Sequence, residues 1–222
     1  MTYQGYNSMK IKLLFLLTLV AGFASADVLE VRLWKAIPGN SAQLTQHASE
    51  ARSIQLKLGG QVVVATDRQG RLHYATAHKN WVEWAAFQEK LQASDEWTDF
   101  AQKIGAAPAA TLDAHYLINQ VVPMLPSKVY QVYVWEAYPG SRAQLIESAS
   151  TAQPLHEKLG ASVGINVDQM GRVHYLMSFD TWGDWAKFQD ADPTDDVSEF
   201  FAKFYSNPPG KLVEVYSVTR VD

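Results

Sequence analysis

The sequence predicts an α+β fold in which two ferredoxin-like (split βαβ) repeats form one pseudo-dimeric α/β barrel. Three observations support this prediction: the chain matches itself, strand and helix patterns alternate within each matched half, and the opening strand of the second half is largely apolar or aromatic on both faces. A strand that is apolar on both faces must be covered on both faces. The two sheets are therefore expected to cover each other.

The internal match is the strongest signal in the 222 residues. Residues 28–90 align without a gap with residues 129–191, and 26 of the 63 pairs are identical. A unit of about 95 residues is domain-sized and too long for a solenoid repeat. We expect repeat 1 at 27–121, a linker at 122–127 and repeat 2 at 128–222.

Each repeat begins with a strand and continues with a helix. Alternating apolar residues over 28–34 predict the first strand. Pro-Gly pairs at 38–39 and 139–140 end the opening strands and turn the chain. A helix follows in both repeats, and Pro154 predicts a kink or break in the second one, because proline removes a backbone donor.

A hairpin, a tryptophan-bearing helix, a shorter helix and a closing strand complete each repeat. The first hairpin turns at 67–70, Asp-Arg-Gln-Gly, and the first closing strand is expected near 112–121. The order strand, helix, strand, strand, helix, strand is the split βαβ pattern. Such a sheet carries helices on one face only, so the economical arrangement closes both sheets into one barrel.

The N-terminal segment 1–26 has the pattern of a secretory signal peptide. Two lysines precede an apolar stretch at 13–24, and an Ala-Ser-Ala triplet follows. We predict cleavage after Ala26, a periplasmic or secreted protein, and a start at Met1 or Met9. The stretch is too short to span a bilayer, and no membrane span is expected after cleavage.

Composition excludes several classes of function. The chain has no cysteine, which removes thiolate metal sites and cysteine nucleophiles. The formal charge of −4 becomes −6 once the two lysines of the leader are removed. An acidic chain with scattered basic residues argues against nucleic acid as a partner. The sequence also lacks a phosphate-binding glycine loop and the H-E-x-x-H and G-x-S-x-G motifs.

His73 and His174 are the candidate catalytic residues. They occupy equivalent places on the third strand of each repeat, and their neighbours Tyr74 and Tyr175 belong to the set assigned to the helix-covered face. Both histidines are expected to point into the barrel, where histidine can act as a general base or bind a ligand. The alternative is a histidine satisfied by a polar neighbour in the sheet. No third metal ligand is evident, so no metal site is predicted.

Arg32, Trp34, Tyr133 and Trp135 are the candidate ligand-binding residues. They share one face of the two opening strands, which is expected to line the barrel. Aromatic rings and an arginine can hold a planar or anionic ligand. The alternative is that these side chains fill the barrel, as they do in many small barrels.

Together these motifs resemble the dimeric α/β-barrel superfamily. The similar features are a strand ending in Trp before Pro-Gly, a D-x-x-G-R hairpin and a W-x-x-W-A-x-F helix, present in both repeats. The superfamily includes antibiotic-biosynthesis monooxygenase-like and NIPSNAP-like domains, most of which dimerise to form the barrel. The resemblance therefore implies a fused pair, that is, a monomer containing a pseudo-dimeric barrel.

Three functions remain open from the sequence. The first is an exported barrel protein that binds a small apolar or aromatic ligand, or has a structural role, without a cofactor. The resemblance implies two alternatives. One is a cofactor-independent monooxygenase with His73 or His174 as the base and Arg32 as a charge stabiliser. The other is a haem-binding protein.

Overall fold

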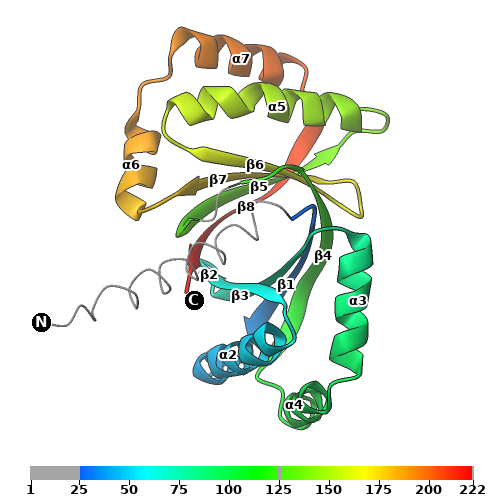
Figure 1. Cartoon of the computed structure of the whole chain (residues 1–222). Coiled ribbons are helices and arrows are strands. Elements are labelled where there is room, and N and C mark those ends of the chain that lie inside the picture. The colour runs from blue at the N-terminus through cyan, green and yellow to red at the C-terminus, as the bar shows by residue number, and fades with distance from the viewer. Residues whose placement is uncertain (1–25, 125–126, 222) are drawn as a thin grey trace, which may run out of the picture.

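The computed structural model describes residues 26–124 and 127–221. The expected signal peptide lies outside the described residues except for Ala26. Eight antiparallel strands form a closed barrel in the order β1-β3-β2-β8-β5-β7-β6-β4, and the helices lie on two opposite sides of it (Figure 1). The predicted fold class, two ferredoxin-like halves forming one pseudo-dimeric α/β barrel, is confirmed.

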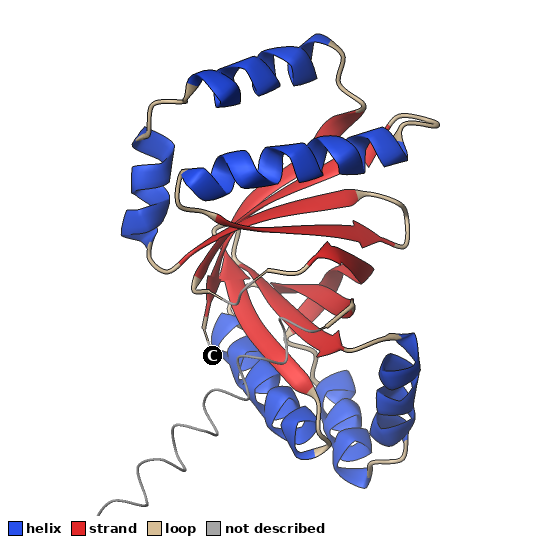
Figure 2. Cartoon of the chain, turned by 45° about the horizontal axis from the view of Figure 1, so that its top comes forward, coloured by secondary structure: helices blue, strands red, loops and turns tan. Residues whose placement is uncertain are grey.

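The two halves of the chain have the same order of elements. The first half contains β1 (Val28–Ala36), α2 (Ser41–Lys57), β2 (Gln61–Asp67), β3 (Arg71–His78), α3 (Trp81–Gln92), α4 (Asp95–Ala106) and β4 (Ala110–Val122). The second half contains β5 (Val129–Ala137), α5 (Arg142–Lys158), β6 (Ser162–Asp168), β7 (Val173–Phe179), α6 (Trp182–Asp190), α7 (Asp195–Ser206) and β8 (Gly210–Arg220). Each half folds into a four-stranded sheet with its own helices on the outer face (Figure 2).

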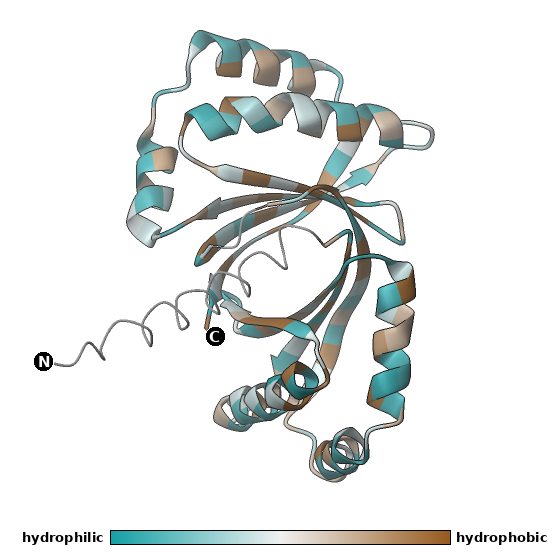
Figure 3. Cartoon of the chain, viewed as in Figure 1, coloured by the Kyte–Doolittle hydropathy of each residue, from teal (hydrophilic) through white to brown (hydrophobic). Residues whose placement is uncertain are grey.

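Two antiparallel ladders join the sheets into the barrel. β2 pairs with β8 and β4 pairs with β6, so each junction joins a strand of one half to a strand of the other. Apolar residues occur along the strands between the two helix layers (Figure 3). The inner face of the sheet carries separate apolar clusters around Leu33 and Val134, while the outer face packs against the helices. Both faces of the sheet are therefore covered, as the sequence pattern indicated.

The helix α5 corrects one expectation. Of the kink or break expected at Pro154, the break is absent, because α5 is one helix from Arg142 to Lys158. Leu145 and Ala152 on its inner face are buried in the core of the second half. Because tertiary packing of an apolar face supplies most of a helix's stability in a protein, it can offset the missing hydrogen bond.

Candidate functional site

His73 and His174 line a cavity of about 160 Å³ inside the barrel. They are 7% and 3% exposed, and aliphatic side chains from both sheets make up most of the remaining wall. Both histidines therefore lie on the side of the sheet that the sequence pattern assigned to them.

An aspartate from the hairpin of the same half holds each of these histidines. In the first half, His73 Nε2 lies 2.9 Å from Asp67 Oδ2, which also accepts the Arg71 Nε–H at 2.6 Å. In the second half, Asp168 makes the same contacts with its histidine at 3.0 Å and its arginine at 2.7 Å. Each imidazole is thus oriented by a carboxylate, as a general base would be, and each is also a satisfied buried group.

Tyrosines from the opposite half cover these pairs. The ring of Tyr216, from β8, lies 5.2 Å from the ring of His73 and 5.0 Å from the Arg71 guanidinium. Tyr116, from β4, is the counterpart against His174, with 5.1 Å between the rings. Burial raises the pKa of both tyrosine hydroxyls. Each cluster therefore joins the two halves of the chain across the barrel.

The buried charges in the first cluster compensate one another. Burial alone would raise the pKa of Asp67, but hydrogen bonds from His73 and Arg71 outweigh it and lower the pKa to about 2. Burial would likewise lower the pKa of Arg71, but its bonds to Asp67 and Glu214 raise it instead. The ion pair is therefore charged at neutral pH and anchors the hairpin.

The four candidate ligand-binding residues do not line the barrel. Arg32 and Trp34 face the helices of the first half, and Tyr133 and Trp135 face those of the second. Their expected placement inside the barrel is therefore wrong.

Strand register explains the difference. Leu33 is the residue of β1 that pairs with His73, whereas Trp34 pairs with Leu72. Directly opposite residues share a face, and Leu72 belongs to the core beneath the helices of the first half. β1 alternates a fully apolar set with a set that includes Glu30, Arg32 and Trp34, and this alternation alone does not indicate which face meets the helices.

These four residues instead line two equivalent cavities between helices and sheet. The N-half cavity has a volume of about 480 Å³ and is walled by α2, α4, β1 and β3. The C-half cavity is walled by α5, α6, α7, β5 and β7, and its volume is about 200 Å³. Small-molecule sites usually occupy about 300–1,000 Å³, so the N-half cavity has the size of such a site and the C-half cavity is smaller.

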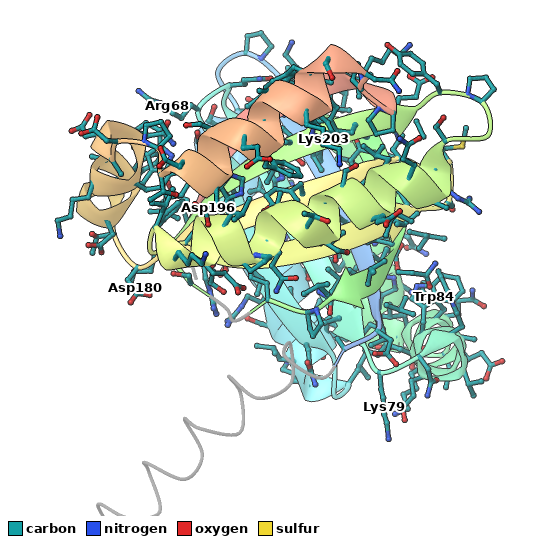
Figure 4. The ribbon with its side chains drawn as sticks, turned by 90° about the horizontal axis from the view of Figure 1, so that it is seen from above. Arg68, Lys79, Trp84, Asp180, Asp196 and Lys203 are labelled. Carbon is teal, nitrogen blue, oxygen red and sulfur yellow. The ribbon has the colours of Figure 1, made fainter. Side chains whose placement is uncertain are left out.

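The last helix of each half, α4 or α7, accounts for much of this difference. α4 has Ala101 and Gly105 where α7 has Phe201 and Tyr205, and all four line the cavity of their own half. α7 lies alongside α5 (Figure 4), where Asp196 pairs with Lys158. Ala101 and Gly105 are solvent-exposed, and a Cβ added at Gly105 would meet nothing within 4 Å. The N-half cavity is therefore open along α4.

The two cavities also differ in one buried polar residue. His156 of α5 places Nδ1 2.7 Å from the Tyr175 hydroxyl, and burial lowers the pKa of this histidine. The equivalent residue in α2 is Gln55, which is 1% exposed, and its Oε1 has no hydrogen-bond partner among the described residues. Sequence reasoning missed both residues. The available signal was the replacement of glutamine by histidine at one position of the aligned helices.

The described residues fit a haem poorly. The C-half cavity contains His156, but its volume is below the range of small-ligand sites, and a porphyrin is larger than most such ligands. The N-half cavity contains His47, but Arg32, the one cationic side chain on its wall, is already bonded to Glu30. Propionate groups would find no free cation there. Within the described ranges, no three His, Asp or Glu side chains are grouped to hold a metal ion.

Comparison with known proteins identifies the fold. No protein-family model and no curated protein matches the sequence. A candidate monooxygenase from Fusobacterium nucleatum has a TM-score of 0.61 at 10% identity, covering 89% of this chain and 94% of its own. An anthrone oxidase-like protein has a TM-score of 0.56 at 10% identity, with 88% and 91% covered. A haem-binding protein from Thermus thermophilus has a TM-score of 0.50 at 11% identity, with 89% and 92% covered.

These similarities extend over nearly the whole of each compared protein, but at identities that establish the fold alone. Chlorite dismutases are also among the structural neighbours. The chain therefore has the fold of the monooxygenase-like and chlorite dismutase-like α+β barrel proteins.

Proposed function

We propose that this protein binds a small, neutral aromatic molecule in the N-half cavity. The observation that carries the proposal is the contrast between two equivalent cavities in one chain. Aromatic side chains of α7 line a C-half cavity of only about 200 Å³, whereas α4 leaves about 480 Å³ open beside the sheet. A volume of this size with mostly apolar walls is typical of a small-molecule site.

The wall favours a planar ligand without net charge. Trp34, Trp97 and Phe100 offer aromatic faces and edges on which a ring can pack. The charge of Arg32 is compensated, because its guanidinium bonds to the buried carboxylate of Glu30. An anionic ligand would have to compete with that carboxylate, so a neutral aromatic ligand is favoured over an anion.

Titration with naphthalene tests the proposal. Trp34 and Trp97 line the cavity, so a bound ring is expected to change tryptophan fluorescence in a saturable way. The double variant Ala101→Phe/Gly105→Tyr, which installs the residues of the second half, is expected to abolish this change. A flat titration with naphthalene and with larger aromatic probes would refute the proposal.

The second candidate is a cofactor-independent monooxygenase activity in the barrel. The orientation of His73 and His174 by buried aspartates supports it, since such pairs can accept a proton. Oxygen uptake with a single-ring phenol is a direct test, because the barrel cavity, at about 160 Å³, is below the range of ordinary small-molecule sites. Turnover that persists in the His73→Ala/His174→Ala variant, with the fold intact, would discard this candidate.

Haem is a third candidate ligand, and its binding can be followed by its absorbance. A Soret band that is lost on replacing His47 but not His156 would assign haem to the N-half cavity, against the poor fit described above. Because Arg32 is paired with Glu30, we expect haem to bind no better than other apolar ligands.

We further infer that the protein is exported and arose by tandem duplication. The leader pattern of 1–26 and the internal match support these two inferences. No helix in the described ranges is long and apolar enough to cross a bilayer. Mass spectrometry of protein from the native host tests export: a mature chain beginning at Asp27 is expected, and an intact leader would refute cleavage.

A further inference from the structure

Gln55 is a buried polar residue on the wall of the N-half cavity. It lies on the inner face of α2 with Ala48 and Ala51, among buried apolar side chains. The residue is 1% exposed, and its Oε1 forms no hydrogen bond with any described residue. Buried carbonyl oxygens in native proteins are nearly always paired, so an exception calls for a partner.

The second half shows how the same position is satisfied when the cavity is filled. There the equivalent residue is His156, whose Nδ1 lies 2.7 Å from the hydroxyl of Tyr175. The equivalent tyrosine of the first half, Tyr74, lines the same cavity as Gln55. The second half therefore completes this hydrogen bond internally, while in the first half Gln55 lines the cavity and its buried carbonyl oxygen has no partner among the described residues.

We infer that Gln55 selects ligands carrying a hydrogen-bond donor, such as a phenolic hydroxyl or a ring N–H, through its side-chain carbonyl. This inference rests on the proposed binding in the N-half cavity and specifies the class of ligand. Aromatic walls provide most of the contact area, and one buried acceptor sets the orientation, which is the usual division of roles in small-molecule sites. A ligand that lacks the donor leaves the acceptor unsatisfied and binds less tightly.

Three probes of similar shape test the inference by fluorescence titration of the full mature chain. 2-Naphthol carries a donor, 2-methoxynaphthalene carries only an acceptor, and naphthalene carries neither. The wild-type chain is expected to bind 2-naphthol about tenfold more tightly than 2-methoxynaphthalene, as one hydrogen bond to a buried group implies. In Gln55→Leu the preference is expected to disappear through weaker binding of 2-naphthol alone.

Matched variants separate the alternatives. Gln55→Met keeps the side-chain length without the amide and should behave like Gln55→Leu, which guards against a folding defect in either one. His156→Leu removes the polar group at the equivalent place in the C-half cavity and should leave the 2-naphthol preference unchanged.

The possible results test the role of Gln55 separately from ligand binding in the N-half cavity. Equal binding of all three probes by the wild-type chain would overturn the role of Gln55 and leave the cavity as a binding site. A donor preference that survives in both Gln55 variants would also overturn it. Failure of all three probes to bind would refute the proposed function itself.

Discussion

Filling the N-half cavity should stabilise the protein while removing its binding site. The double variant Ala101→Phe/Gly105→Tyr gives α4 the residues that α7 has at Phe201 and Tyr205. A fully buried phenylalanine contributes about 1.5–3 kcal/mol. Phe201 is only partly buried and Tyr205 is 64% exposed, so together they should contribute about 1–2 kcal/mol. Replacing the helical glycine adds about 0.5 kcal/mol and replacing the helical alanine costs a similar amount, so the expected total stays at about 1–2 kcal/mol.

The same substitutions should bring the cavity close to the 200 Å³ of its counterpart. That volume is below the range of ordinary small-molecule sites, so the affinity for naphthalene should fall at least about tenfold. Urea denaturation measures the first effect, provided that the slope m is unchanged. Fluorescence titration of the same preparations measures the second.

The reciprocal variant Phe201→Ala/Tyr205→Gly provides the matched control. It opens the C-half cavity, so it should lose stability by a similar amount and acquire weak naphthalene binding, as apolar cavities made by truncation do. A filled variant that retains wild-type affinity would refute the location of the site. A filled variant that is less stable than the wild-type chain would refute the packing argument.

Three further predictions concern stability. Asp67→Asn should lower the free energy of unfolding, measured in urea, by about 3 kcal/mol, because it leaves Arg71 buried without its main carboxylate. The wild-type chain should lose stability between about pH 4 and pH 2, where Asp67, with its pKa lowered to about 2, becomes protonated. This loss should be absent in the variant. The wild-type chain should lose stability below pH 6.5, since burial lowers the pKa of His156 and the unfolded chain then binds a proton that the folded chain does not. His156→Gln should make this fall in stability less steep, and a residual slope from His78, whose pKa burial also lowers, should remain. A slope unchanged from the wild-type chain would contradict the assignment to His156. Pro154→Ser should raise the free energy of unfolding by about 2 kcal/mol, and with it the midpoint of thermal unfolding, because serine restores a backbone donor inside the helix. An unchanged midpoint would mean that α5 gains nothing from the restored donor.

The sequence predicted the architecture well because the architecture depends on local patterns repeated twice. The placement of His73 followed from one clear contrast, in which the strongly apolar set around Tyr175 indicated the helix-covered face of its strand. Trp34 was misplaced because the fully apolar face of β1 was expected to meet the helices, and only the register with β3 links Trp34 to Leu72. Alternation identifies two faces of a strand but does not indicate what covers each of them.

The candidate site was harder to predict because it depends on differences between the halves. Identity revealed the fold, whereas Gln55 and His156 are one of several differing pairs at the end of the aligned helices. Their significance appears only when the Tyr175 hydroxyl is seen to satisfy one of them. Cavity volume likewise depends on how α4 and α7 lie against the sheet, which hydrophobic periodicity does not specify.

The contrast between the halves suits a chain in which the second half contributes mainly stability and the first half contributes the binding site. Most substitutions that fill a cavity stabilise a protein, and open sites are retained where binding requires them. Here the aromatic residues of α7 and the His156–Tyr175 bond complete the packing of the second half. The two cross-half clusters around Asp67 and Asp168 then tie that half to the first. A filled half can thus support an open one, because the barrel makes them a single folding unit, and the first half is where a ligand should be sought.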